Sequence, residues 1–202
     1  MVSDTREELN YRHQLATARH AIHVALENCH HPIVSTKFSE ESAVFLHLVT
    51  QVKADIPIVW VDTGYNTRAT REFAQQLQQS LKLNLKRFEP LDHTITFPPA
   101  LDDPDHAEFT QEVKIEPFQR ALRTLQADGW LSSIRRYQSA HRHSLPTFHT
   151  ASNGVLKASP ILEWTAETVS RYRQEHELPQ GPACFDPTKG EAFRECGLHL
   201  TA

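Results

Sequence analysis

The chain of 202 residues contains only three cysteines and six glycines. Three cysteines are too few for a disulfide scaffold, and none belongs to a C-x-x-C pair of the kind that holds structural zinc or an iron–sulfur cluster. The low glycine content and the absence of Ser/Gly or Gln tracts exclude a fibrous or disordered chain. Any chemistry of Cys29, Cys184 or Cys196 is therefore thiol chemistry.

Long apolar runs and a strong charge imbalance are also missing. No stretch approaches the roughly 18 apolar residues that a membrane span needs, and the N-terminus lacks the layout of a signal peptide. The formal net charge of −4 and the pI near 6.3 argue against a general nucleic-acid binder. We therefore expect a cytoplasmic protein without membrane or nucleic-acid partners. Its 39% hydrophobic residues can bury one core, so residues 1–202 are expected to form a single domain.

The thirteen histidines do not follow a metal-ligand pattern. His30 and His31 are sequence neighbours whose side chains point apart, and His141, His143 and His149 have no cysteine or carboxylate partner at ligand spacing. We expect no metal site.

Hydrophobic periodicity and turn residues predict a chain of alternating strands and helices. Helices are expected over residues 4–28, 40–53, 67–81, 114–126 and 165–177, and strands over 32–36, 56–61, 83–88 and 129–134, with two short strands inside 146–161. Short strand–helix–strand connections require parallel strands with right-handed crossovers. The expected fold class is therefore α/β, a three-layer sandwich with a mainly parallel twisted sheet.

Three other segments complete this expectation. An N-terminal helix falls within residues 1–30, and residues 90–113, which have little periodicity, form a surface excursion. Residues 178–202, rich in proline and mixed charge, form a flexible C-terminal arm that carries a cysteine.

Polar residues follow the first two predicted strands, at the place where an open α/β sheet binds its ligands. Hydroxyls, a lysine and the amides of a helix N-terminus suit a phosphate or sulfate, and the first loop supplies them through Ser35, Thr36, Lys37, Phe38, Ser39 and Ser42. Plain N-capping is the alternative role for these hydroxyls. The second loop, Asp62, Thr63 and Gly64, could hold a ribose hydroxyl or a base amide, or could simply form a turn.

Cationic side chains are expected near the same edge of the sheet. Arg135, Arg136 and Arg142 follow the fourth main strand, and guanidinium groups suit phosphate oxygens. Because adjacent residues after a strand point to opposite sides, one of Arg135 and Arg136 should face the cleft. The alternatives are a solvated surface for the arginines and, for Lys114, an ion pair with Glu112 or Glu116 in place of an anionic ligand.

Cys196 is the candidate nucleophile. It lies on the polar C-terminal arm between Arg194 and His199, whose positive charge would stabilise a thiolate. Cys29, in contrast, lies in an apolar periodic stretch typical of inert cysteines. Cys184 is left unassigned, since its spacing does not demand a redox pair with Cys196.

Several motifs, taken in order along residues 30–200, resemble those of the phosphoadenylyl sulfate (PAPS) reductase family, which has the adenine nucleotide α-hydrolase-like fold. The motifs are the loop and helix over 35–49, Val-Asp-Thr-Gly-Tyr at 61–65, Leu-Lys-Leu-Asn-Leu-Lys at 81–86, Lys-Ile-Glu-Pro at 114–117, Ile-Arg-Arg with Gln-Ser at 134–139, Pro-Ile-Leu-Glu-Trp at 160–164 and Glu-Cys-Gly-Leu-His at 195–199. The last motif is the most specific of them.

The resemblance implies an oxidoreductase of assimilatory sulfate reduction and cysteine biosynthesis. It implies that Cys196 attacks the sulfur of PAPS, leaving an S-sulfonated cysteine and adenosine 3′,5′-bisphosphate, and that thioredoxin or glutaredoxin then releases sulfite. Relatives that use adenylyl sulfate carry cysteines for an iron–sulfur cluster. This chain has too few cysteines for such a cluster. The expected substrate is therefore PAPS, and no bound cofactor is expected. The oligomeric state, monomer or homodimer, is left open.

The chain departs from the family pattern at the first loop and near its end. Lys37 and Ser39 replace the first serine and the glycine of the usual Ser-Phe-Gly, and Ser39 is expected to lose a positive φ angle that glycine permits. The stretch before Cys196 and the excursion over 90–113 are shorter than usual, so substrate enclosure should differ. A non-catalytic or regulatory nucleotide-binding paralogue is therefore the second hypothesis. An ATP pyrophosphatase, whose loop needs two glycines that are missing here, is the third.

Overall fold

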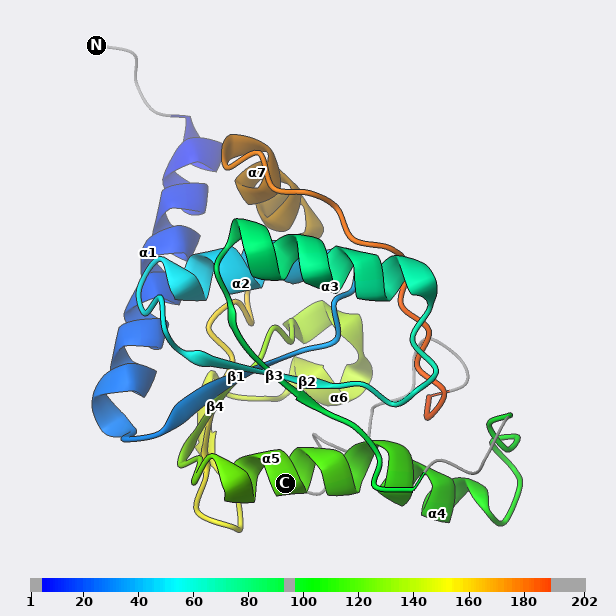
Figure 1. The fold of residues 1–202 in the computed structure, drawn as a ribbon. Coiled ribbons are helices and arrows are strands. Elements are labelled where there is room, and N and C mark those ends of the chain that lie inside the picture. The colour runs from blue at the N-terminus through cyan, green and yellow to red at the C-terminus, as the bar shows by residue number, and fades with distance from the viewer. Residues whose placement is uncertain (1–4, 93–96, 190–202) are drawn as a thin grey trace.

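The computed structural model describes residues 5–92 and 97–189 (Figure 1). The helices are α1 (Arg6–Asn28), α2 (Ser42–Thr50), α3 (Arg68–Ser80), α4 (His106–Thr110), α5 (Glu116–Thr124), α6 (Ala140–His143) and α7 (Ala166–Glu175). The strands are β1 (Pro32–Thr36), β2 (Pro57–Val61), β3 (Asn84–Phe88), β4 (Gly129–Leu131), β5 (Phe148–Thr150) and β6 (Leu156–Ala158). A π-helical turn (Gln111–Ile115) joins α4 to α5, and a 3-10 turn (Arg136–Gln138) precedes α6.

The strands form one six-stranded sheet in the order β3-β2-β1-β4-β6-β5. Neighbouring strands are parallel except for the β5–β6 pair, which is antiparallel. After β1 the chain adds β2 and β3 on one side of it, and then returns to place β4 on the other side. The strand order therefore reverses between β1 and β4, and in such sheets the crevice beyond the strand ends at this point is the usual place for a ligand.

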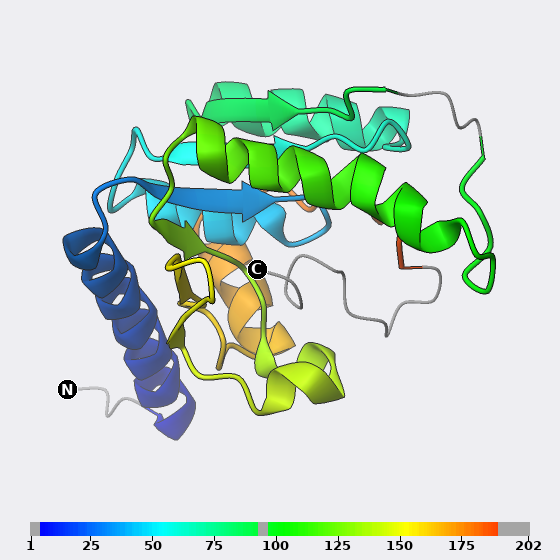
Figure 2. The same cartoon turned by 90° about the horizontal axis from the view of Figure 1, so that it is seen from below.

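Each face of the sheet is covered by helices. Val34 packs with apolar residues of α1, α2, α3 and α7, while its neighbour Ile33 packs with Phe118 and Leu122 of α5 on the opposite face. This alternation follows from the two-residue period of a strand. Figure 1 shows α5, with α4 next to it, below the central strands, and α2 and α3 above them; Figure 2 shows the same elements seen from below. The predicted α/β sandwich with a mainly parallel sheet is confirmed.

Two predicted boundaries differ from the structure. The excursion over 90–113 ends earlier than expected, because α4 begins at His106 and continues through the π-helical turn into α5. Phe109 and Val113 are buried, and the Phe109 ring lies 5.5 Å from that of Tyr65, so tertiary packing stabilises a helix whose periodicity is weak in sequence. Strand β4 is shorter than predicted and ends at Leu131. Among the described residues, no helix combines the length and apolar character that crossing a bilayer requires.

The described part of the predicted C-terminal arm, residues 178–189, packs against the rest of the molecule. The side chains of Leu178 and Thr188 are buried, and the amide of Gly181 donates to the carbonyl of Glu40 at 2.9 Å. The arm therefore borders the loop that follows β1.

Candidate functional site

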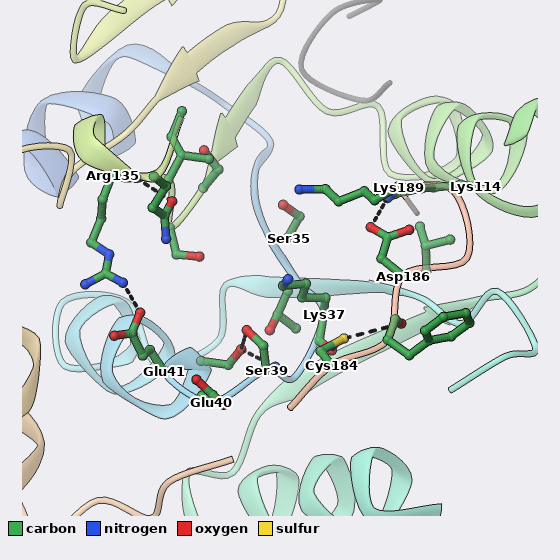
Figure 3. A pocket seen from close by; sticks show the side chains of 18 of the residues that line it. Ser35, Lys37, Ser39, Glu40, Glu41, Lys114, Arg135, Cys184, Asp186 and Lys189 are labelled. Carbon is green, nitrogen blue, oxygen red and sulfur yellow. Dashed lines mark hydrogen bonds and ion pairs between the residues drawn. The ribbon is translucent and has the colours of Figure 1, made fainter. Parts of the chain in front are cut away.

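A cavity of about 710 Å³ opens at the carboxyl ends of β1 and β4 (Figure 3). Its walls come from the loop after β1, the loop after β2, the π-helical turn, the segment after β4 and the C-terminal segment 183–189. Lining residues carry five cations and three carboxylates, so the cavity has an excess of positive charge; these are Lys37, Lys114, Arg135, Arg142, Lys189, Glu40, Glu41 and Asp186. Volume and charge suit an anionic ligand of nucleotide size.

The loop after β1 is shaped around Phe38. This side chain is fully buried, its ring stands edge-on to Trp60 at 5.2 Å, and its backbone has φ of 52°. The amide of Ser39 donates to the hydroxyl of Ser42 at 2.8 Å, which ties the loop to the start of α2. Phe38 therefore anchors the loop in the hydrophobic core and does not line the cavity. The other predicted residues of this loop do line it: Ser35, Thr36, Lys37, Ser39 and Ser42.

Ser39, which replaces the family glycine, does not have a positive φ angle in the structure. Among the described residues, the non-glycine positions with positive φ are Phe38, Lys82, Gln126 and Glu177. The left-handed conformation lies one residue earlier, at Phe38, where burial against Trp60 supports it. Replacement of the family glycine by Ser39 therefore carries no strain of this kind.

Arg135 reaches the cavity from the segment after β4. It forms an ion pair with Glu41 at the start of α2, and its guanidinium lies 5.1 Å from the Tyr137 ring centre. Its side chain is buried, and the Nη1 atom has no hydrogen-bond partner in the structure. A buried donor without a partner is costly, so Nη1 is a ready contact for a ligand oxygen.

Gln138 holds the second arginine of this wall. Its Oε1 accepts hydrogen bonds from the backbone amide of Arg135 at 3.0 Å and from Nη1 of Arg142 at 2.5 Å. Arg136, in contrast, is absent from the cavity wall. Its guanidinium bonds to Glu163 and to the carbonyl of Leu145 at 3.0 Å, so it ties the 3-10 turn to neighbouring loops. Of the adjacent pair, the structure brings only Arg135 to the cavity.

Lys114 projects from the π-helical turn into the opposite wall. Its Nζ lies 2.5 Å from Asp186 Oδ2 and 3.1 Å from Thr188 Oγ1, both in the C-terminal segment. Lys114 pairs with neither Glu112 nor Glu116, the two partners that the sequence suggests. Glu116 instead binds Arg120. Burial raises the pKa of Asp186, but the Lys114 ammonium and its hydrogen bonds outweigh burial and hold that pKa below its ordinary value.

The loop after β2 contributes less than predicted. Asp62 is fully buried and lies away from the cavity; its carboxylate accepts from Asn66 Nδ2 at 2.7 Å and from Arg87 at 2.5 Å. Gly64, whose φ of 88° favours glycine, also stays outside the wall. Thr63 and Asn66 line the cavity. Asp62 therefore shapes the loop, and Thr63 is the predicted residue that can touch a ligand.

Sequence reasoning missed four charged residues of the wall, Glu40, Glu41, Asp186 and Lys189, and left Cys184 unassigned. Cys184 Sγ lies 3.6 Å from the Lys37 carbonyl oxygen, and burial is the main reason why the pKa of its thiol is raised. No local pattern marks these residues, since their partners are far away in the chain. The predicted catalytic residues Cys196, Arg194 and His199 lie outside the described residues.

No group of three histidine, cysteine or acidic side chains converges as metal ligands within residues 5–92 and 97–189. The cavity walls offer hydroxyls, ammonium and guanidinium groups, which bind oxyanions directly.

A family model described as the phosphoadenosine phosphosulfate reductase domain matches residues 31–185. The chain belongs to this family. The matched range contains both cavity loops, the Lys114 turn and residues 183–185 of the C-terminal segment, whereas Asp186 and Lys189 of the cavity wall lie beyond it.

Curated relatives and a solved structure agree with this assignment. A phosphoadenosine 5′-phosphosulfate reductase of Synechococcus is 40% identical over 201 residues, covering 83% of this chain and 85% of that protein. Its counterpart from Salmonella choleraesuis is 34% identical, covering 95% of this chain and 90% of that protein. The crystal structure of PAPS reductase from Candida auris, in a phosphate complex, has a TM-score of 0.70 at 20% identity, covering 89% of this chain and 91% of that one, which shows a shared fold. The predicted family is confirmed.

Proposed function

We propose that this protein reduces 3′-phosphoadenylyl sulfate to sulfite and adenosine 3′,5′-bisphosphate in the cytoplasm, with thioredoxin or glutaredoxin as the reductant and no bound cofactor. The observation that carries the proposal is the cationic cavity at the reversal point of the sheet, most of whose lining residues lie inside the range that matches the reductase family. PAPS carries phosphate groups at both ends of its ribose and a terminal sulfate, and cations lie on opposite walls of the cavity. Arg135 lies on one side, with Arg142 joined to it through Gln138, and Lys114 and Lys189 lie on the other side (Figure 3).

The proposed chemistry uses Cys196 as nucleophile. Its thiolate attacks the sulfate sulfur, a bond forms between the two sulfur atoms, and the bond from sulfur to the bridging phosphate oxygen breaks. Adenosine 3′,5′-bisphosphate leaves with that electron pair. A thiolate of the reductant then attacks Cys196 Sγ and expels sulfite, and the second thiol of the reductant resolves the mixed disulfide. In this scheme Arg194 and His199 favour the thiolate form of Cys196.

The cavity contributes electrostatic stabilisation of the leaving nucleotide. Charge builds on the bridging phosphate oxygen as the S–O bond breaks, and fixed cations and amides stabilise such charge most strongly where water is excluded. Lys37, Ser39 and Ser42 offer these groups at the start of α2. We propose that this loop holds the phosphosulfate end of the substrate.

The deciding experiment is the intact mass of the reduced protein after mixing with PAPS in the absence of thioredoxin. One added sulfonate on the peptide that contains Cys196, removed by thioredoxin together with release of sulfite, is the expected result. Cys196→Ser should gain no sulfonate, whereas Cys29→Ser, a change at a buried cysteine remote from the cavity, should behave as the unaltered protein. Sulfite release by Cys196→Ser would overturn the proposal.

A regulatory nucleotide-binding protein is the second candidate function. It is favoured by the two carboxylates, Glu41 and Asp186, that pair with Arg135 and Lys114 in the cavity wall. The same experiment separates the candidates, because a regulatory protein would bind PAPS without any adduct at Cys196.

A further inference from the structure

The chain from Pro179 to Lys189 follows α7 and precedes the cysteine motif, and its residues 183–189 are the C-terminal segment of the cavity wall. Two contacts fix its course. At Gly181, the backbone amide bonds to the Glu40 carbonyl at 2.9 Å, and a Cβ added there would meet the Ser39 carbonyl oxygen at 2.6 Å. Five residues later, Asp186 binds Lys114. The segment is therefore attached to the loop after β1 and to the π-helical turn, two separate walls of the cavity (Figure 3).

The Lys114–Asp186 ion pair is largely shielded from solvent, and Thr188 forms hydrogen bonds to both partners. The two side chains are 9% and 13% exposed, and Thr188 completes the group with its hydroxyl donating to Asp186 Oδ1 at 2.7 Å while accepting from Lys114 at 3.1 Å. A buried ion pair contributes little net stability compared with apolar packing, but loss of one partner leaves an uncompensated charge. Such a pair is best suited to selecting one arrangement of the chain over others.

The element that presents Lys114 has an irregular backbone. The π-helical turn Gln111–Ile115 inserts between two α-helices and is where Lys114 becomes directed toward Asp186 (Figure 3). Single π-turns within α-helices are rare and occur often at functional sites. Among the described residues, the carboxylate that pairs with Lys114 is that of Asp186, in the C-terminal segment.

We propose that Asp186 is a positioning residue, whose attachment to Lys114 holds the chain that leads to Cys196 beside the cavity. Asp186 lies ten positions before Cys196. If this attachment is lost, the segment keeps the Gly181 and Cys184 contacts with the loop after β1 but loses its charge pairing with the π-helical turn. The segment can then move away from the Lys114 wall, so Cys196 should meet the bound substrate less often and the rate of S-sulfonation should fall.

The inference rests on the proposed function, and its test compares the rate of adduct formation with the affinity for nucleotide. In Asp186→Asn, we expect the single-turnover rate of S-sulfonation by PAPS to fall threefold to tenfold. The dissociation constant for adenosine 3′,5′-bisphosphate should change less than threefold. Asp186→Glu, which keeps the charge for Lys114, should recover at least half of the rate. Asp102→Asn removes the same charge from an exposed side chain and serves as the matched control.

An unchanged rate in Asp186→Asn, or a rate loss that matches an equal loss of nucleotide affinity, would overturn the inference. Hydrogen exchange gives a readout that needs no turnover, because the amide of Thr188 donates to Asp186 Oδ1 at 3.1 Å. Exchange over residues 181–189 should rise in Asp186→Asn, and no rise would also overturn the inference. If the unaltered protein forms no Cys196 adduct with PAPS but exchange over residues 181–189 still rises in Asp186→Asn, the proposed function fails. The attachment of this segment by Asp186 then still stands.

Two further variants cover the case in which Asp186→Asn fails to fold. Thr188→Val keeps the shape of the side chain and removes its hydroxyl from Lys114 and Asp186, so the rate should fall in the same direction but less. Gly181→Ala disturbs the other contact of the segment through the collision with the Ser39 carbonyl. Normal sulfonation in both variants would count against a positioning role for this segment.

Discussion

At the scale of single residues, the two adjacent arginines after β4 have separate tasks. Arg135 is buried in the cavity wall with an unpartnered Nη1 atom, whereas Arg136 binds Glu163 and loop carbonyls outside the cavity. The two differ because Arg135 still has extended backbone, whereas the 3-10 turn that begins at Arg136 directs the next side chain toward Glu163. A comparison of the two positions therefore separates ligand binding from support of the fold.

We expect Arg135→Gln to weaken the binding of adenosine 3′,5′-bisphosphate at least tenfold, because a charge-assisted hydrogen bond contributes about 1.5–3 kcal/mol. Arg136→Gln should change that affinity less than threefold and should instead lower the melting temperature. Titration calorimetry and thermal unfolding of both variants check the prediction. Equal losses of affinity at both positions would contradict the assignment of Arg135 to the cavity.

At the scale of elements, a ring cluster joins α2 to α7. His47 Nδ1 lies 2.9 Å from the Tyr172 hydroxyl, and the His176 ring lies 4.8 Å from that of His47 and 4.2 Å from that of Tyr172. Burial raises the pKa of Tyr172 to about 12. Burial, followed by the charges of His176 and Arg19, lowers the pKa of His47. The interface is thus built for a neutral imidazole.

This cluster predicts a loss of stability on mild acidification. Since His47 has a lower pKa folded than unfolded, the unfolded chain binds more protons once the pH falls below about 6.5, and folding is disfavoured from there down to the lowered pKa. The urea midpoint should therefore be lower at pH 5.5 than at pH 7.5. His47→Gln should reduce this difference, leaving the part due to His149, whose pKa burial also lowers. An identical pH dependence in His47→Gln would refute this.

At the scale of the whole molecule, the cavity is assembled from parts that lie far apart in the sequence. Glu41 meets Arg135 across 94 positions, and Lys114 meets Asp186 across 72. The central strands β1 and β4 bring the first pair together, while packing of the C-terminal segment brings the second. A ligand that contacts all these walls is bound by the folded state alone.

Nucleotide binding should therefore stabilise the molecule globally. At a concentration of adenosine 3′,5′-bisphosphate one hundred times its dissociation constant, linkage gives about 2.7 kcal/mol, which raises the melting temperature of a chain of this size by about 5–10 °C. Thermal unfolding with increasing ligand measures the shift. At the same ligand concentration Arg135→Gln should show a clearly smaller rise, and an equal rise would mean that the ligand binds elsewhere.

The local pattern of this chain determined its elements and its fold class. The first three strands are predicted within a residue of their ends, because each is a short apolar or alternating run closed by turn residues. The loop residues Ser35, Lys37 and Ser42 could be assigned to the cavity for a similar reason, since parallel strands end at one edge of the sheet. Both predictions need only information that lies within a few positions of the chain.

Only the tertiary structure decided which side chains meet at the cavity. The sequence predicts that Lys114 can pair with a neighbouring glutamate, but in the folded chain it pairs with Asp186. Asp62, predicted to face the ligand, is buried outside the cavity wall. The start of α4 likewise depends on burial of Phe109. The physical reason is the same in each case. Charge pairing and burial depend on distances in space, and the folding of distant segments onto one sheet sets those distances.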